Sequence, residues 1–306
     1  MSISCVQRRL LAIAAILTTI LVATVPGSAY ASSGPDWFGW GVHVDFQNST
    51  WRVLYVTYVG TNNPTPQVLA SSVQDISAHC VQQGTGTLTY PTANSAFFDG
   101  KTYIRCELPA LSAGLSALGY TPPSGSNPIC PCALGAGPFW VDAHVRQINP
   151  AGGTMPLFDA SDRGVRLNLV TNSGKVRTQM MAAQNLAATP RVFTSYTSPE
   201  RTIDPAGNRD VMGWHGRAMV RVADHFGWLN YLTDPAWRTF FKNDVFNNIL
   251  GVWHESPSVS GTTTITSGYE LGMGGGDLYI GYSPATGKYF QGELVVGGIE
   301  PGCKGS

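Results

Sequence analysis

The sequence predicts an all-β protein: a two-sheet antiparallel β-sandwich of the jelly-roll type with one or two short helices. Short runs of alternating apolar and polar residues recur along the chain, with Gly, Asn and Pro between them. The 306 residues include 35 Gly, 12 Tyr, 12 Phe and 8 Trp, a mixture that suits many strands joined by tight turns. The 19 basic residues balance the 19 acidic ones, so no basic field for nucleic acid exists.

The N-terminus has the pattern of a signal peptide. Arg8 and Arg9 precede the uncharged apolar run Leu10 to Val25, and Ala29-Tyr30-Ala31 fits a small-x-small cleavage site. The run is short for a membrane-spanning helix, so we favour cleavage after residue 31 over an anchor. We therefore expect a secreted, extracellular protein with no membrane span after cleavage.

The cysteines support an oxidising compartment. Cys5 leaves with the signal peptide, and five cysteines remain. We expect Cys80 to pair with Cys106, and Cys303 to pair with Cys130 or Cys132. A bridge within Cys130-Pro131-Cys132 would close a strained ring, and a zinc site would lack a second pair of ligands.

The elements follow from the local patterns. Alternation predicts a hairpin from Val42 to Tyr58 that turns at Asn48-Ser49. We expect helical structure in Val68–Cys80, in Leu108–Leu118 and, after an Asp-Pro N-terminus, in Ala236–Asn243. Further strands are predicted at Tyr103–Leu108, Phe139–Val145, Val165–Val170, Val176–Met181, Arg217–Ala223, Asp277–Tyr282 and Gln291–Val296.

Four segments carry a family resemblance. Phe98-Asp99-Gly100 with Tyr103-Ile104, the later run Phe139 to Arg146, Trp214 to Val220, and Leu278 to Leu294 occur in order. They resemble the strands of laminin-G-like domains of the concanavalin A-like lectin/glucanase superfamily. The resemblance implies a concanavalin A-like sandwich over residues 85–303, which leaves residues 32–84 as an N-terminal β-hairpin extension packed on that body. It also implies recognition of carbohydrate or of another extracellular protein, with calcium as a candidate ion.

Catalysis of the glucanase type is disfavoured. Those enzymes place alternate acids on one strand face, whereas none of the six Glu of the mature chain lies two residues from another acid. The neighbours His254 and Glu255 would point to opposite faces of a strand, as would Asp224 and His225. A non-catalytic binding module is therefore the preferred function. A polysaccharide hydrolase or lyase on the same scaffold, and a structural surface-assembly protein, are the alternatives.

Two candidate sites remain. Asp159 and Asp162 could join Asp99 and Asp277 as oxygen ligands of calcium, although capping of the loop by these side chains is the preferred explanation. The aromatic residues near the C-terminus could stack on sugar rings, because the C–H edges of a pyranose are apolar and slightly positive. The residues predicted for this binding rim are Trp237, Arg238, Trp253, His254 and Tyr282, with Tyr269 and Tyr289 nearby.

Overall fold

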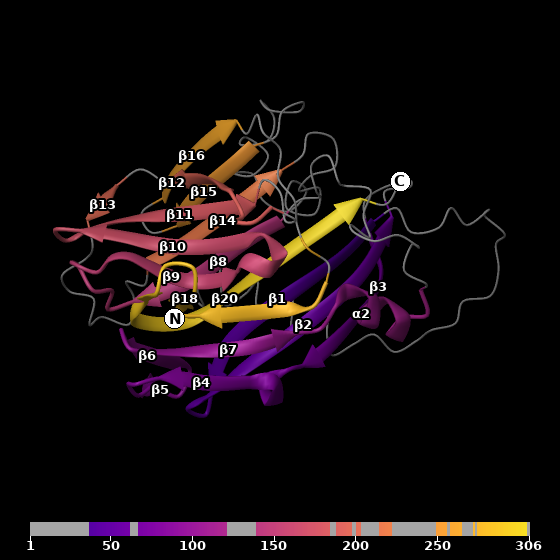
Figure 1. Ribbon diagram of the computed structural model, residues 1–306, viewed down its shortest axis with the longest axis horizontal. Coiled ribbons are helices and arrows are strands. Elements are labelled where there is room, and N and C mark those ends of the chain that lie inside the picture. The colour runs from indigo at the N-terminus through magenta and orange to yellow at the C-terminus, as the bar shows by residue number, and fades with distance from the viewer. Residues whose placement is uncertain are drawn as a thin grey trace, which may run out of the picture. The chain divides into compact units, whose positions relative to one another are not determined.

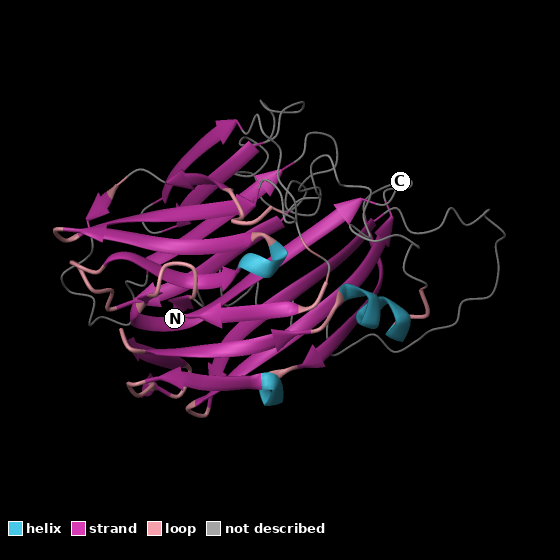
Figure 2. Cartoon of the chain, in the orientation of Figure 1, coloured by secondary structure: helices cyan, strands magenta, loops and turns pink. Residues whose placement is uncertain are grey.

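The computed structural model describes residues 37–61, 67–120, 139–183, 188–197, 200–202, 214–221, 249–255, 258–264, 272 and 274–304. Strands dominate these residues, and short helices join a few of them (Figure 2). Every strand pairing within these described ranges is antiparallel. The predicted all-β, antiparallel fold class is therefore confirmed. None of the helices in the described part combines the length and the apolar character that a membrane crossing needs.

The larger sheet has ten strands and is organised around the last strand of the chain (Figure 1). In spatial order its strands are β16 (Ser258–Thr264), β15 (Ile249–Glu255), β14 (Trp214–Arg221), β8 (Phe139–Arg146), β20 (Gln291–Lys304), β1 (Trp37–Gln47), β2 (Thr50–Thr61) and β3 (Gln67–Asp75). The start of β20 also pairs with β6 (Ser95–Asp99), which pairs with β5 (Thr89–Thr92).

The second sheet has eight strands and carries the site described below. In spatial order they are β12 (Phe193–Thr197), β11 (Lys175–Ala183), β10 (Val165–Asn172), β9 (Gly153–Ala160), β17 (Gly276–Ile280), β7 (Thr102–Leu108) and β4 (Cys80–Gly84), with β13 (Arg201–Thr202) beside β11. The short hairpin of β18 (Tyr282–Ser283) and β19 (Lys288–Tyr289) follows β17 directly. In the part of the chain that the structure describes, the helices are α2 (Leu111–Ala117) and the 3₁₀ turns η1 (Ser77–His79) and η3 (Ser161–Arg163).

The two sheets share one hydrophobic core. Trp40, Phe46 and Phe98 come from the ten-stranded sheet, and Ile104 and Phe158 come from the eight-stranded sheet, yet all belong to one cluster of buried side chains. A strand with one buried face must alternate in exposure along its length, because successive side chains point to opposite faces. The shared core therefore confirms the predicted sandwich, and it fixes which residues of each strand face outward.

The hairpin at the start of the described chain forms as predicted. β1 and β2 pair along their whole length, from Trp37 opposite Gly60 to Gln47 opposite Thr50. Asn48 and Ser49 both have left-handed backbones, with φ of 51° and 57°. A two-residue turn with two positive φ angles matches the twist of the strands it joins, and Asn is among the residues that tolerate it best.

One predicted helix is wrong. The stretch Val68–Cys80 is mostly strand β3, which pairs with β2 from Leu54 to Thr61, and only its end forms the turn η1. Helix propensity is a weak preference, and the open edge of β2 offers backbone hydrogen bonds that outweigh it. The helix predicted in Leu108–Leu118 is confirmed as α2. The helix predicted at Ala236–Asn243 lies outside the described residues.

The residues predicted as an N-terminal extension contribute to both sheets. β1 pairs with β20, and β2 and β3 continue the ten-stranded sheet outward from β1. β4 instead pairs with β7 in the eight-stranded sheet. Pro35–Ser306 form one compact unit. The predicted boundary after residue 84 stays a prediction.

Candidate functional site

The outer face of the eight-stranded sheet combines aromatic and charged side chains on three adjacent strands. Tyr103 and Arg105 of β7 point outward, because the alternating residues Ile104 and Cys106 are buried in the core. In the paired strands, Gln83 of β4 lies opposite Tyr103 and Tyr279 of β17 lies opposite Arg105. Since directly opposed residues of neighbouring strands share a face, these side chains form one continuous surface.

The hairpin β18–β19 adds two more rings to this surface, because Tyr282 and Tyr289 are directly opposed across it. The ring of Tyr282 stacks on Tyr103 with centroids 4.4 Å apart and planes 21° apart, and it lies 4.7 Å from Tyr289 and 5.9 Å from Tyr279. Tyr103 also lies 6.1 Å from Tyr279. We call Tyr103, Tyr279, Tyr282 and Tyr289 the tyrosine cluster. All four rings are partly exposed.

A glycine and a buried serine fix the hairpin on the sheet. Gly281 has a left-handed backbone with φ of 83°, and a Cβ atom there would lie 2.7 Å from the Phe98 ring, so this sharp exit from β17 suits glycine alone. The Gly281 N–H donates to the Leu157 carbonyl at 2.9 Å, and the Gly281 carbonyl accepts from Phe290 at 2.9 Å. Ser283, two residues after Gly281, is buried, and its hydroxyl donates to Oδ2 of Asp159 at 2.5 Å.

Asp159 is the buried end of this anchor. Its carboxylate is fully buried, and it also accepts from the Ser161 backbone at 3.0 Å and lies 3.3 Å from Nε of Arg166. The Arg166 guanidinium lies 4.0 Å from the centroid of the Phe193 ring. A buried carboxylate is tolerated when it is paired and hydrogen-bonded in this way. The Asp159 carboxylate therefore anchors the hairpin that carries part of the tyrosine cluster, and it is not accessible to solvent.

An ion pair borders the cluster. Nε of Arg105 donates to Oδ2 of Asp277 at 2.9 Å, and the hydroxyl of Tyr279 donates to the same oxygen at 3.1 Å. The side chains of Arg105 and Asp277 are 42% and 21% exposed, so the pair faces solvent. On the other side of the cluster, the Tyr103 hydroxyl donates to Oε1 of Gln83 at 2.7 Å. Hydrogen-bond donors and acceptors therefore lie along the edges of the aromatic surface.

The hydroxyls of Tyr103 and Tyr279 keep their protons at neutral pH. Burial raises the pKa of Tyr103, and the neighbouring Tyr282 and Tyr289 raise it further. Burial also raises the pKa of Tyr279, as does its hydrogen bond to Asp277. The hydrogen bond to Asp277 raises the pKa of the Arg105 guanidinium in turn. At neutral pH, Tyr103 and Tyr279 are therefore neutral hydrogen-bond donors beside a cationic Arg105.

The structure places the predicted binding-rim residues unequally. Tyr282 lies in the tyrosine cluster, with Tyr289 beside it. Trp253 and His254 lie on β15, for which only the backbone is described. Trp237, Arg238 and Tyr269 lie outside the described residues. Tyr103 and Tyr279 were not among the predicted site residues, although the alternation of their strands already placed both on the face away from the core.

The four aspartates proposed for calcium have other partners. Oδ1 and Oδ2 of Asp99 accept from the backbones of Lys101 at 2.8 Å and Thr87 at 3.0 Å, which closes the turn into β7. Asp162 pairs with Arg191 at 2.9 Å, Asp277 pairs with Arg105, and Asp159 is buried under the hairpin. In the part of the chain that is described, no three His, Cys, Asp or Glu side chains gather as a metal site. Calcium binding stays an untested prediction.

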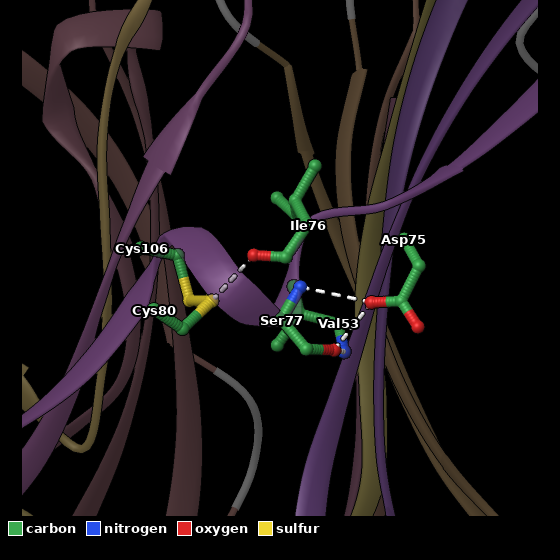
Figure 3. Close-up of a disulfide and its surroundings, with 6 residues drawn as sticks. All are labelled: Val53, Asp75, Ile76, Ser77, Cys80 and Cys106. Carbon is green, nitrogen blue, oxygen red and sulfur yellow. Dashed lines mark hydrogen bonds between the residues drawn. A yellow bond between two sulfur atoms is a disulfide. The ribbon is translucent and has the colours of Figure 1, made fainter.

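The predicted disulfide Cys80–Cys106 is confirmed (Figure 3). The two cysteines are directly opposed in the β4–β7 pair, and both are buried. The bridge ties β4, which carries Gln83, to β7, which carries Tyr103. Cys303 lies on β20 with only its backbone described, and Cys130 and Cys132 lie outside the described residues, so the second bridge stays a prediction.

Comparison with known proteins assigns no family. No protein-family model and no curated protein matches the chain. Distant solved structures include the receptor-binding domain of botulinum neurotoxin C/D mosaic serotype, with TM-score 0.37 and 8% identity over 85% of this chain and 46% of that chain. Another is the botulinum neurotoxin serotype D binding domain, with TM-score 0.40 and 7% identity over 86% of this chain and 47% of that chain.

A third such structure belongs to botulinum neurotoxin type C, whose cell entry is described as dependent upon interaction with two ganglioside molecules. Its TM-score is 0.39 at 7% identity, over 85% of this chain and 47% of that chain. The chain thus spans about half the length of these proteins. Scores this low identify no relative and carry no function across, so the resemblance to laminin-G-like domains stays a prediction.

Proposed function

We propose that this chain is an exported, non-catalytic carbohydrate-binding module whose tyrosine cluster contacts the sugar. The observation that carries the proposal is the gathering of four partly exposed tyrosine rings on one outward sheet face. Aromatic rings present an electron-rich face to which slightly positive C–H groups are attracted. The hydrogen-bonding groups that edge the rings, Gln83, Arg105 and Asp277, are suited to sugar hydroxyls.

The cluster is held rigidly before any ligand arrives. Tyr103 and Tyr279 stand on paired strands, and the hairpin that bears Tyr282 is anchored through Gly281 and Ser283. A preorganised surface spends little free energy on ordering side chains when it binds. This rigidity supports a binding role for the cluster.

Two features support export. The N-terminal pattern ending at Ala31 is that of a signal peptide, and the disulfide between Cys80 and Cys106 suits an oxidising compartment. An exported binding module with a solvent-facing aromatic surface would meet glycans outside the cell. A direct test of export is N-terminal sequencing of the secreted chain, which should begin at Ser32.

A glycan array with the mature chain tests the binding proposal. The wild type should bind a defined set of oligosaccharides, Tyr282→Ala should lose most of that binding, and Tyr282→Phe should retain it because the ring remains. Repeating the array with a calcium chelator tests the calcium prediction separately. Absence of binding to any glycan would overturn the proposal, and release of new reducing ends from a bound polysaccharide would replace it with a hydrolase.

A further inference from the structure

From the groups beside the tyrosine cluster, we infer that its ligand is a neutral sugar that presents two adjacent free hydroxyls to the pair formed by Arg105 and Asp277. The inference rests on the proposed function and specifies the class of sugar. It is drawn from the geometry and the charges around this pair.

The pair offers a donor and an acceptor side by side to solvent. A guanidinium has five N–H donors, and the bond to Asp277 together with a contact to the Tyr279 hydroxyl uses only part of them. A carboxylate has about four lone-pair sites, and Oδ2 of Asp277 accepts from Arg105 and Tyr279, which leaves further acceptor capacity. One sugar hydroxyl can accept from Arg105 while its neighbour donates to Asp277.

The pair lies within reach of a ring stacked on the cluster. Tyr103 and Arg105 are two residues apart on one strand face, a separation of about 7 Å. Tyr279 lies directly opposite Arg105 and bonds to Asp277, so it connects the aromatic surface to the polar pair. A sugar ring against the tyrosines would therefore direct its edge hydroxyls at Arg105 and Asp277.

The charges around the pair disfavour an acidic sugar. The charges of Arg105 and Asp277 cancel within the ion pair, and the exposed Glu107, directly opposite Asp277, adds a negative charge. Among the described residues, Lys101 lies in the turn before β7, beyond Tyr103, and Arg191 is paired with Asp162. Lys288 follows the hairpin turn opposite the buried Ser283, on the other face of the hairpin from Tyr289. A uronic or sialic acid carboxylate at the Arg105 position would face two carboxylates, whereas a neutral diol meets no such repulsion.

Isothermal titration calorimetry on the full mature chain tests the inference with three probes. These are neutral hexose oligosaccharides, their uronic acid counterparts, and neutral analogues methylated at one of two adjacent hydroxyls. Neutral oligosaccharides should bind best, with an affinity that changes little between about 50 and about 500 mM salt. Methylation of one hydroxyl should weaken binding by about tenfold, which corresponds to the loss of one hydrogen bond to a charged group.

Variants locate the effect. Arg105→Ala and Asp277→Asn should each weaken neutral-sugar binding by about tenfold or more. The matched control is Arg177→Ala on β11 of the same sheet, which breaks a similarly exposed pair with Glu200 and should leave the affinity unchanged. Tighter, salt-sensitive binding of uronic acids, or full affinity in both pair variants, would overturn the inference. If binding still requires Tyr282 in that case, the proposed function stands and the sugar class alone is wrong.

Discussion

Removing the disulfide between Cys80 and Cys106 should destabilise the protein by an amount that the structure specifies. The bridge joins residues separated by 26 positions. In the chain-entropy model, a loop of that length raises the free energy of unfolding by about 3.5 kcal/mol. The variant Cys80→Ala/Cys106→Ala removes the bridge without leaving a free thiol in the buried sites of both cysteines.

The loss should also reach the tyrosine cluster. Among the described strands, β4 pairs with β7 alone, so the bridge secures an edge of the eight-stranded sheet. Around Cys80 the remaining contacts are modest: its Sγ lies 3.4 Å from the Ile76 carbonyl, and the neighbouring Ser77 accepts from the Val53 N–H at 2.9 Å (Figure 3). Fraying of β4 would weaken the bond from Tyr103 to Gln83, so we expect a small loss of sugar affinity as well.

Equilibrium unfolding in guanidinium chloride measures the effect. The midpoint should fall by an amount that corresponds to about 3–4 kcal/mol, with faster hydrogen exchange in Val81–Gly84 than elsewhere in the sheet. A loss below about 1 kcal/mol would refute the reasoning. It would mean that the bridge between residues 26 positions apart does not restrict the unfolded chain as the chain-entropy model requires. Wild type in reducing buffer should be destabilised at least as much as the variant, because reduction would also open the predicted bridge at Cys303.

Three further perturbations test the turns and the hairpin anchor. Gly281→Ala should cost about 2 kcal/mol in thermal unfolding, since it combines a φ of 83° with a Cβ 2.7 Å from the Phe98 ring; an unchanged melting temperature would contradict this. Ser283→Ala should cost roughly 1–3 kcal/mol and weaken sugar binding, because the buried Asp159 loses a donor; full affinity would separate the anchor from the site. Burial alone would raise the pKa of Asp99, but backbone N–H groups lower it overall, so its stabilisation is present above its unfolded pKa and disappears as pH falls through its folded pKa. The stability difference between wild type and Asp99→Asn, measured by denaturation from about pH 6 to about pH 2, should therefore shrink as the pH falls.

Local pattern was enough to predict much of the fold. The alternation of Tyr103–Leu108 predicts a strand because one of its faces must enter the core, and the structure buries Ile104 and Leu108 as that pattern requires. The same logic failed at Val68–Cys80, where strand formation depends on pairing with β2 and not on the local sequence. Pairing between distant segments is information that a window of ten residues does not contain.

The candidate site shows the same limit. Arg105 and Asp277 are 172 positions apart in sequence, and they meet only because β17 enters the sheet beside β7. Tyr282 and Tyr289 were predictable from the aromatic composition of the C-terminal region. Tyr103 could have been added only by knowing which predicted strands are neighbours.

A crystal structure of the mature chain with its tightest-binding oligosaccharide tests the central claim most directly. The claim predicts a sugar ring in van der Waals contact with the rings of Tyr103, Tyr279, Tyr282 or Tyr289, on the outer face of the eight-stranded sheet. A sugar bound at another surface, with the tyrosine cluster bare, would contradict it.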